Sequence, residues 1–474
     1  MTLRRHPFAA VNLISDPVHG YVELTKRLGR DASGAAGLPD EDVAEEDLLD
    51  SAWLQRLRRI SQLQSARWVF PTAEHSRFTH GLGVMHEAGL WGRSLYPSLR
   101  AAATELGAGP VPSEGLVVET LRLAGLLHDV GHGPFAHFFD DHVLAAFAAP
   151  ADPRRPDGKR LSHEDLSQRI IEDEVGPLIR GIRRAPGAVP ERDAFADGES
   201  VDPRWVSFLI SKPPLHDPAM PVWVRWLQPL LSGVFTVDNL DYVRRDAYLI
   251  GVAVGPVDVE RLRRYTFIGE RGLTLYEPGL GALEMFLTAR LFMYQQVYFH
   301  RTVRAIDLDL AEVFGNSIRA IFGDGSPAER LAAYADLDEY ALLHQAARWA
   351  RGESVRRPGD PGEPGDGRVA PDVAEAWRAI LLRQPHWRAE AELRATYEDG
   401  QRPDDEIAAL GPAEPGRVAI DLALVDARPA EATASDTLLA VEARDGGPGT
   451  PVSRALARLP AWALIARRYR RASA

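Results

Sequence analysis

Cysteine is absent from the 474 residues, so disulfides, thiolate metal ligands and thiol nucleophiles are excluded. Any metal ion must therefore bind to His, Asp or Glu side chains. Lysine occurs only at Lys26, Lys159 and Lys212, and arginine carries almost all of the basic charge. No stretch approaches the ~20 apolar residues of a membrane span, and the first residues lack the apolar segment of a signal peptide. These absences predict a cytoplasmic protein with no membrane partner.

The net charge of −12 and the pI near 5.7 disfavour an extended nucleic-acid surface without excluding nucleic acid altogether. A small polyphosphate remains compatible, because a metal ion and a few arginines can make one cleft positive within an acidic surface. The 45% of hydrophobic residues indicates a globular protein. Its length allows several domains of about 100–200 residues each.

Apolar residues recur mostly at helical spacing, which predicts a mainly α fold. Helices are expected over residues 48–63, 82–99, 116–127, 138–147, 163–174, 283–314 and 373–393. Strand signals are fewer. They predict a strand and turn over 11–24, a hairpin formed by 265–268 and 273–276, and two strands within 418–429 and 437–446.

Composition divides the chain into a helical body over 1–351, a linker over 352–371 and a small α+β lobe over 372–474. The linker is rich in Pro, Gly and charge, which is typical of extended or disordered segments. Within the body, residues 26–47 are Gly-rich and then acidic, and we expect a surface insertion there.

The most informative stretch is LRLAGLLHDVGHGPFAHFFDD at residues 121–141. An apolar helical run ends at His128 and Asp129, and two glycines and a proline then stop or bend the helix. A neutral imidazole beside a hard carboxylate suits a divalent ion that must also hold water and phosphate oxygen. The alternative, which an isolated His-Asp pair favours, is a buried hydrogen-bonded pair at a helix end.

Two further residues support the metal interpretation. His80 opens an apolar helix upstream, and Asp238 opens another downstream. A His, a His-Asp pair and a later Asp, each at the edge of an apolar helix, predict a metal site that is assembled by folding.

The order His80, His128, Asp129, Asp238 resembles the HD phosphohydrolase superfamily. One branch of that superfamily, the SAM-and-HD-domain deoxynucleoside triphosphate triphosphohydrolase and its bacterial relatives, is similar over residues 16–301. The similar segments, in order, are DPVHGYVEL, WLQRLRRISQLQ, VFPTAEHSRFTHGLGV, LLHDVGHGPFAHFFD, SHEDLS, VDNLDYVRRD and MYQQVYFHR. The resemblance implies an HD-domain helical body and a metal-dependent hydrolysis of dNTP to deoxynucleoside and triphosphate.

The resemblance also assigns roles. The implied metal ligands are His80, His128, Asp129 and Asp238, which leave coordination positions for water and a phosphate oxygen. The ion could be Fe, Mn, Zn, Ni or Mg, because this ligand set suits several metals. Arg77 would contact the α-phosphate; its alternative is a surface salt bridge.

The implied non-ligand catalytic cluster is His132, His137, Asp140 and His163. A histidine with a pKa near 7 can act as acid or base, and the sequence leaves open which one is the acid. The positions expected to hold the sugar and its 3′-hydroxyl are Gln62, Tyr242, Asp246 and Tyr298, with Arg290 and Tyr294 nearby. A tyrosine packed on deoxyribose would exclude a 2′-hydroxyl, although an aromatic stripe of this kind is more often part of a core.

Other substrates remain open. The family pattern has a phosphate-binding lysine where this chain has Asn239. The same site could act on nucleoside monophosphates, cyclic nucleotides or single-stranded nucleic-acid ends. It could also belong to a nucleotide-sensing regulatory protein with little turnover.

The polar edge of the predicted 48–63 helix carries Asp50, Gln55 and Arg58. These residues match the positions with which the family grips an activating guanine nucleotide between subunits, so the resemblance implies a homo-oligomer, dimer or tetramer. A carboxylate, an amide and a guanidinium form a chemically sensible guanine reader. The alternative is an exposed helix edge whose side-chain pairs contribute about 0.2–0.5 kcal/mol each.

Overall fold

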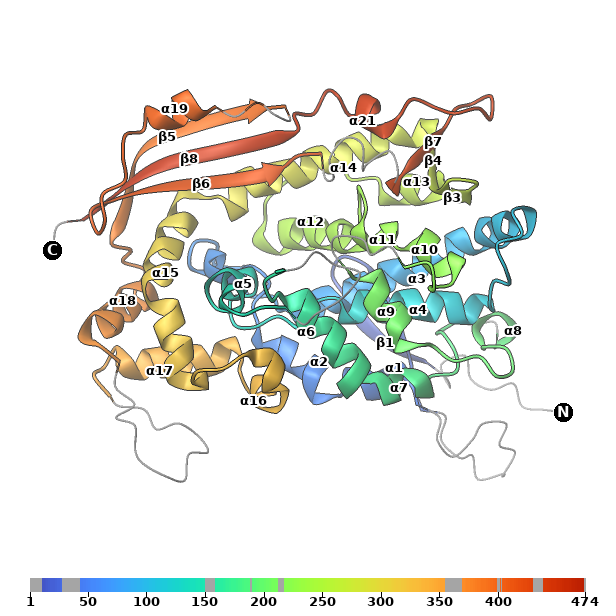
Figure 1. The fold of residues 1–474 in the computed structure, drawn as a ribbon, viewed down its shortest axis with the longest axis horizontal. Helices are drawn as coiled ribbons and strands as arrows, with labels where there is room; N and C mark the ends of the chain where they lie inside the picture. The colour runs from blue at the N-terminus through green and yellow to red at the C-terminus, as the bar shows by residue number, and fades with distance from the viewer. Residues whose placement is uncertain are drawn as a thin grey trace.

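The mainly α architecture predicted from the sequence is confirmed by the computed structural model, which is drawn in Figure 1. The structure describes residues 11–27, 43–149, 158–187, 190–211, 217–353, 369–398, 401, 403–428 and 438–472. Most of the predicted insertion at 26–47 and of the predicted linker at 352–371 therefore lies outside the described residues. None of the helices within the described ranges is long and apolar enough to cross a membrane.

Two long antiparallel helices form the centre of the body, α3 (Arg77–Glu105) and α4 (Glu114–Leu127). Gly125 lets them approach closely, because a Cβ there would lie 2.8 Å from the Val84 carbonyl oxygen. Helix α12 (Val237–Ile250) packs across α3. Thr236 caps its first turn and Gly251, at φ 74°, ends it.

Shorter helices surround this centre. The helices that concern the site are α1 (Glu45–Leu49), α2 (Ala52–Arg56), α5 (His137–His142), α6 (His163–Arg169), α16 (Leu331–Ala335) and α17 (Glu339–Trp349). The remaining helices of the body are α7 (Gly176–Gly181), α8 (Pro190–Asp193), α9 (Pro203–Leu209), α10 (Val222–Leu227), α11 (Pro229–Ser232) and α13 (Val259–Arg264).

The continuous helix expected over residues 48–63 is wrong. Helix α1 ends at Leu49, α2 begins at Ala52, and a 3₁₀ turn over Leu57–Arg59 closes the segment. Ser51 causes the break, because its side chain accepts a hydrogen bond from the Leu54 amide and caps a new helix. Apolar spacing runs through this break, so it did not reveal it.

The single helix expected over 283–314 is also interrupted. Helix α14 (Leu280–Met293) passes into a π-helical turn, Tyr294–Tyr298, and α15 (Arg301–Phe322) starts afresh. His300 caps the new helix, since its Nδ1 accepts from the Thr302 amide at 3.2 Å. Such π turns often occur at functional sites.

The strands form three small sheets. An antiparallel pair joins β1 (Val11–Asp16) to β2 (Gly20–Thr25). A second sheet pairs β3 (Thr266–Gly269) with β4 (Gly272–Tyr276) and adds β7 (Ala440–Glu442) in parallel. The third has the order β5-β8-β6, with β5 (Trp387–Tyr397), β6 (Val418–Asp426) and a central β8 (Trp462–Arg471). Figure 1 shows this third sheet at one end of the molecule.

The helix expected over 373–393 is correct only for its first half. Helix α18 (Pro371–Leu381) stops before Arg383, which has φ 55°, and Pro385 follows. The next residues, AEAELRA, favour helix by propensity but form β5, because they pair along their whole length with β8. No strand was expected at β8.

The C-terminal residues pack directly on the body. Strand β7 extends the body's β3-β4 hairpin, and the buried Trp377 indole donates to Ser317 Oγ on α15 at 2.8 Å. The division into a body and a C-terminal lobe stays a prediction.

Candidate active site

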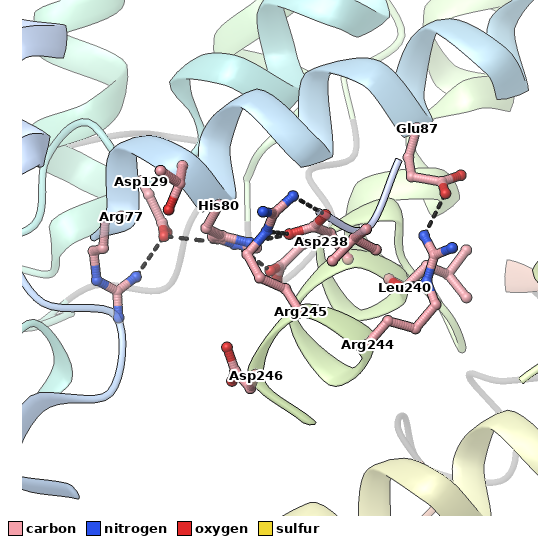
Figure 2. Close-up of polar contacts among 12 residues, drawn as sticks. Arg77, His80, Glu87, Asp129, Asp238, Leu240, Arg244, Arg245 and Asp246 are labelled. Carbon is pink, nitrogen blue, oxygen red and sulfur yellow. Dashed lines mark hydrogen bonds and ion pairs between the residues drawn. The ribbon is translucent and has the colours of Figure 1, made fainter. Parts of the chain in front are cut away.

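The four predicted metal ligands meet where α3, the end of α4 and the start of α12 come together. His80 Nε2 lies 3.1 Å from Asp238 Oδ1 and 3.9 Å from Asp129 Oδ2. His128 Nε2 lies 3.3 Å from Asp129 Oδ1 and 3.6 Å from Asp238 Oδ1. Figure 2 shows His80 between the two carboxylates. Residues 158 positions apart in the chain are thus brought together at one point.

The imidazoles of this cluster are oriented for coordination. His128 Nδ1 donates to the Gly125 carbonyl at 2.8 Å, which leaves a lone pair on Nε2. That Nε2 is buried and has no hydrogen-bond partner among the described residues. His80 Nδ1 donates to Asp241 at 2.8 Å, so its Nε2 also faces the carboxylates. Two imidazole nitrogens and two carboxylates, one of the nitrogens otherwise orphaned, fit a divalent metal ion.

Asp241 is one of the site residues that were not predicted from the sequence. It is fully buried, and its carboxylate accepts from His80, from His19 Nε2 at 2.6 Å, and from Arg245 at 2.8 and 2.9 Å. Gly83 makes room for this network, because a Cβ there would lie 2.1 Å from Asp241 Oδ1. The available signal was the position of Asp241 one turn after Asp238 on the same helix.

Electrostatics around His80 favour positive charge. Burial disfavours an imidazolium, but Asp238 and Asp241 outweigh it and raise the pKa of His80 to about 10. Burial likewise opposes ionisation of Asp241, yet His19, His80 and Arg245 hold its pKa well below its usual range. A bound cation would satisfy the same carboxylates.

Arg77 is the first residue of α3 and is 4% exposed. Its guanidinium donates to Asp129 Oδ2 (Figure 2). The alternative of a surface salt bridge is therefore wrong. Arg77 also lines the cavity described below, so it presents a positive charge next to the predicted metal ligands.

The four residues of the predicted catalytic cluster come together beside the metal ligands. The rings of His132 and His163 stack with centroids 3.6 Å apart, and His137 lies edge-on to both. Asp140 accepts a hydrogen bond from His163 Nδ1 and lies 3.6 Å from His137 Nδ1. His132 Nε2 is 3.4 Å from Asp129, so this cluster adjoins the metal set.

The two stacked imidazoles lie in different electrostatic environments, which shift their pKa values in opposite directions. Burial disfavours charge on His163, but Asp140 overcomes it and raises the pKa of His163 to about 9. Burial, the Arg77 guanidinium and His163 together hold the pKa of His132 well below its usual range. At neutral pH one ring therefore carries a proton that the other lacks.

A cavity of about 450 Å³ opens beside both clusters. Its walls include Arg77, His80, Asp129, His137, His163 and Asp238 from the two clusters, and Gln62, Tyr242, Asp246, Tyr294 and Tyr298 from the predicted sugar site. The volume is within the range of small-molecule sites, about 300–1,000 Å³.

The sugar-site residues form a connected wall. Tyr298 Oη donates to Asp246 at 2.6 Å, and His75 Nε2 holds the other oxygen of Asp246 at 2.8 Å. Tyr294 packs edge-on to Tyr298 with centroids 4.9 Å apart. Gln62 Oε1 is buried and has no partner among the described residues, which leaves an acceptor at the cavity wall.

Arg290 lies behind this wall. Its Nε donates to Tyr242 Oη at 3.2 Å, its Nη1 donates to the Asp426 carbonyl at 2.7 Å, and its guanidinium lies 4.9 Å from the Tyr294 ring centre. It therefore supports two tyrosines of the cavity, and contact with a ligand through Arg290 stays a prediction.

The predicted guanine-binding residues lie on the α1–α2 segment, outside the set that lines the cavity. Asp50, at the end of α1, and Arg58 are exposed. Arg58 Nε donates to Gln55 Oε1 at 2.8 Å and its guanidinium covers the Phe78 ring at 3.7 Å. Their role stays a prediction.

Two parts of the chain match known family models. Residues 77–189 match the HD domain, and residues 257–357 match the HD associated region. The chain is 30% identical over 353 residues to the uncharacterized protein YwfO of Bacillus subtilis, covering 71% of this chain and 66% of that one. It is 27% identical over 353 residues to human deoxynucleoside triphosphate triphosphohydrolase SAMHD1, covering 70% of this chain but only 49% of the human one.

Two solved structures share the fold over almost the whole chain. A hypothetical protein from Aquifex aeolicus superposes with a TM-score of 0.64 at 24% identity, covering 97% of this chain and 96% of its own. A phosphohydrolase from Bacteroides thetaiotaomicron gives a TM-score of 0.63 at 20% identity, covering 98% of this chain and 100% of its own. The structural match therefore covers a larger share of this chain than the 71% and 70% matched by the two sequence relatives.

Proposed function

We propose that this chain, which carries an HD domain and an HD associated region, is a metal-dependent phosphohydrolase that cleaves dNTP to deoxynucleoside and triphosphate. The observation that carries the proposal is the cavity itself. His80, Asp129 and Asp238 line it together with Arg77 and with the Tyr298–Asp246 pair. A phosphate and a sugar can therefore be held side by side.

The metal ion would be held by His80, His128, Asp129 and Asp238. When bound, it supplies a Lewis acid for the phosphate oxygen and lowers the pKa of a coordinated water. Arg77 places its guanidinium beside Asp129, where it would neutralise the negative charge on the non-bridging oxygens of the phosphate that is attacked. The α-phosphate is the one assigned to Arg77, because attack there releases the triphosphate whole.

The stacked histidines, His132 and His163, provide the proton that the leaving group needs. His163, whose Nδ1 is held by Asp140, is the group that carries a proton at neutral pH and lines the cavity. It is therefore the general acid that protonates the departing 5′-oxygen of the deoxynucleoside. His132 lies between His163 and Asp129 and stays neutral. Its stacked ring holds the charged His163 ring in its position at the cavity. His137 is 64% exposed at the same cavity, where its imidazole is available to the phosphates of the substrate.

The residues of the predicted sugar site set the preference for deoxynucleotides. Asp246, fixed by Tyr298 and His75, accepts from the 3′-hydroxyl, and the free Gln62 oxygen offers a second acceptor. The Tyr298 ring then packs on the sugar where a ribonucleotide would place its 2′-hydroxyl. A polar group pressed against an aromatic face without a partner is costly, so ribonucleotides bind less tightly.

The experiment is a product analysis. Purified protein is incubated with each dNTP and with Mn²⁺ or Mg²⁺, and products are resolved by ion-exchange chromatography, with the matching NTP as control. Deoxynucleoside and tripolyphosphate in equal amounts are expected. Cleavage of monophosphates, cyclic nucleotides or single-stranded ends alone would reassign the substrate, and binding without turnover would indicate a regulatory protein.

Regulation by a guanine nucleotide forms part of the same proposal. The exposed Asp50 carboxylate can accept from guanine N1 and N2, next to the Gln55–Arg58 pair. A nucleotide bound there by two protomers would join them into a dimer or tetramer, and activity would rise with assembly. Its support is the position of these residues around α2, between the end of α1 and the following 3₁₀ turn, because Arg56 of α2 reaches the backbone of His132 at 2.6 Å.

A further inference from the structure

The loop that carries His132 to His137 has a strained backbone. Phe135 and Ala136 adopt φ angles of 61° and 48°, a left-handed region that side chains other than glycine rarely occupy. Both residues are fully buried. Such strain persists only where the surroundings hold the backbone in place. We refer to residues 130–136 as the imidazole loop.

Three buried side chains outside the cavity hold this loop by its backbone. Arg56 Nη1 donates to the His132 carbonyl at 2.6 Å, and Tyr334 Oη donates to the Gly131 carbonyl at 2.8 Å. Glu339 Oε2 accepts from the Phe135 amide at 3.3 Å. Arg56, Tyr334 and Glu339 are each fully buried, and we call them the loop clamp.

Arg56 and Tyr334 of the loop clamp also contact each other, and neighbouring residues hold Arg56 and Glu339 in place. Arg56 donates through Nε and Nη2 to the Leu337 carbonyl at 3.0 and 2.7 Å, and its guanidinium lies 4.5 Å from the Tyr334 ring centre. Glu339 Oε1 accepts from Arg67 at 2.9 Å, and its Oε2 also accepts from the Ser61 amide at 3.2 Å. The clamp thus ties α2 and the α16–α17 corner to one loop.

The polar side chains of the loop clamp indicate that these residues position the loop and do not merely fill space in the core. A buried arginine and a buried glutamate are expensive to desolvate, and apolar residues of the same size would pack the space at less cost. Each polar group here reaches a backbone atom of the imidazole loop, which no apolar side chain could do. The imidazole loop also packs closely against the backbone of His163 through Gly131, because a Cβ there would lie 2.2 Å from the His163 carbonyl oxygen.

From this geometry we infer that Arg56, Tyr334 and Glu339 are positioning residues, which fix the imidazole loop so that the His132 ring stacks on His163. The inference rests on the proposed phosphohydrolase function for its kinetic consequence. Its structural consequence, an ordered loop, is independent of any substrate. Because none of the three lines the cavity, their loss should lower kcat and leave KM nearly unchanged.

The test compares Tyr334→Phe with Tyr96→Phe. Each removes one hydroxyl that donates to a backbone carbonyl at 2.8 Å, but the partner of Tyr96 is Pro112, away from the loop. Tyr334→Phe should lower kcat about two- to tenfold, the rate equivalent of one neutral hydrogen bond, with KM within about twofold of wild type. Tyr96→Phe should match wild type in both constants.

Hydrogen exchange followed by mass spectrometry on the Mn²⁺-loaded full chain gives the second readout. Peptides covering residues 130–136 should exchange faster in Tyr334→Phe and Glu339→Gln, while peptides of α4 stay protected and metal content is unchanged. Arg56→Met should show the largest effect if it folds; the other two variants decide the question if it does not.

Wild-type kcat together with wild-type loop exchange in Tyr334→Phe and Glu339→Gln would overturn the inference. An equal loss of kcat in Tyr96→Phe would overturn it as well, since the effect would then be general destabilisation. If the wild type hydrolyses no nucleotide, the proposed function fails, and the exchange data still decide whether the clamp orders the loop.

Discussion

Replacement of Asp241 by asparagine should weaken metal binding, although Asp241 does not face the metal. Its two oxygens accept from His80 Nδ1, His19 Nε2 and two nitrogens of Arg245, at 2.6–2.9 Å. An amide keeps one acceptor and turns an NH₂ group towards donors. The His80 ring then loses the contact that fixes its tautomer and orientation.

The expected magnitude follows from this contact set. Loss of a partner that orients a metal-binding histidine typically costs about 10–100-fold in metal affinity, or about 1.4–2.8 kcal/mol. The free energy of unfolding should also fall, because breaking a buried ion pair costs about 3–5 kcal/mol. The lower end of that range is expected, since Arg245 keeps a second partner, Asp16, at 2.7 Å.

A matched control separates the two effects. Asp309 is also fully buried and accepts from the amide and Nδ1 of one histidine, His386, at 2.8 and 3.0 Å, far along the chain from the metal ligands. Both variants are measured by Mn²⁺ competition against a fluorescent chelator and by urea unfolding. Asp309→Asn should lose stability only. Wild-type Mn²⁺ affinity in a destabilised Asp241→Asn would refute the reasoning.

Four further outcomes are expected. Asp129→Ala should lose metal by elemental analysis and activity together. His132→Ala should keep its metal, yet turn over about 10²–10⁴-fold more slowly, the range expected when a general acid loses its effect, because the His163 ring is then no longer held by the stack. Although burial opposes it, Asp140 raises the pKa of His163 to about 9, above the ~6.5 of an unfolded chain. The protonated His163 should therefore stabilise the folded protein by about 3 kcal/mol relative to His163→Gln. This stabilisation should be complete below pH ~6.5 and should vanish as the pH rises through 9. GTP or dGTP should raise both the mass in light scattering and dNTP turnover of the wild type, but not of Asp50→Ala.

Each of these four predictions would be contradicted by a specific result. A metal-free Asp129→Ala protein with full activity would remove the metal assignment. Loss of metal from His132→Ala would move that residue into the coordination shell. A stability difference for His163→Gln that grows above pH 9 would reverse the proposed protonation state. A wild type whose mass and rate ignore guanine nucleotides would leave Asp50, Gln55 and Arg58 as a solvated surface.

Local sequence was enough to predict the mainly α fold and to name the His and Asp residues that the structure brings together. Apolar spacing identifies α3, α4 and α12, and the glycines after His128 mark where a helix must end, because both signals act within a few residues. The predicted metal ligands could be named because each lies at the edge of such a helix; that they bind a metal stays a prediction. The breaks at Ser51 and at the Tyr294–Tyr298 turn were missed, since apolar periodicity continues through them.

Tertiary structure decided the rest. Residues 387–397 become a strand because β8 supplies their hydrogen-bond partners, which outweighs a helical propensity of a few tenths of a kcal/mol per residue. Asp241 became part of the site because Gly83 leaves room for it against α3. The loop clamp joins positions up to 281 residues apart, from Arg56 to Leu337. Such contacts leave no local trace, because the partners of a buried polar group are chosen only when the chain has folded.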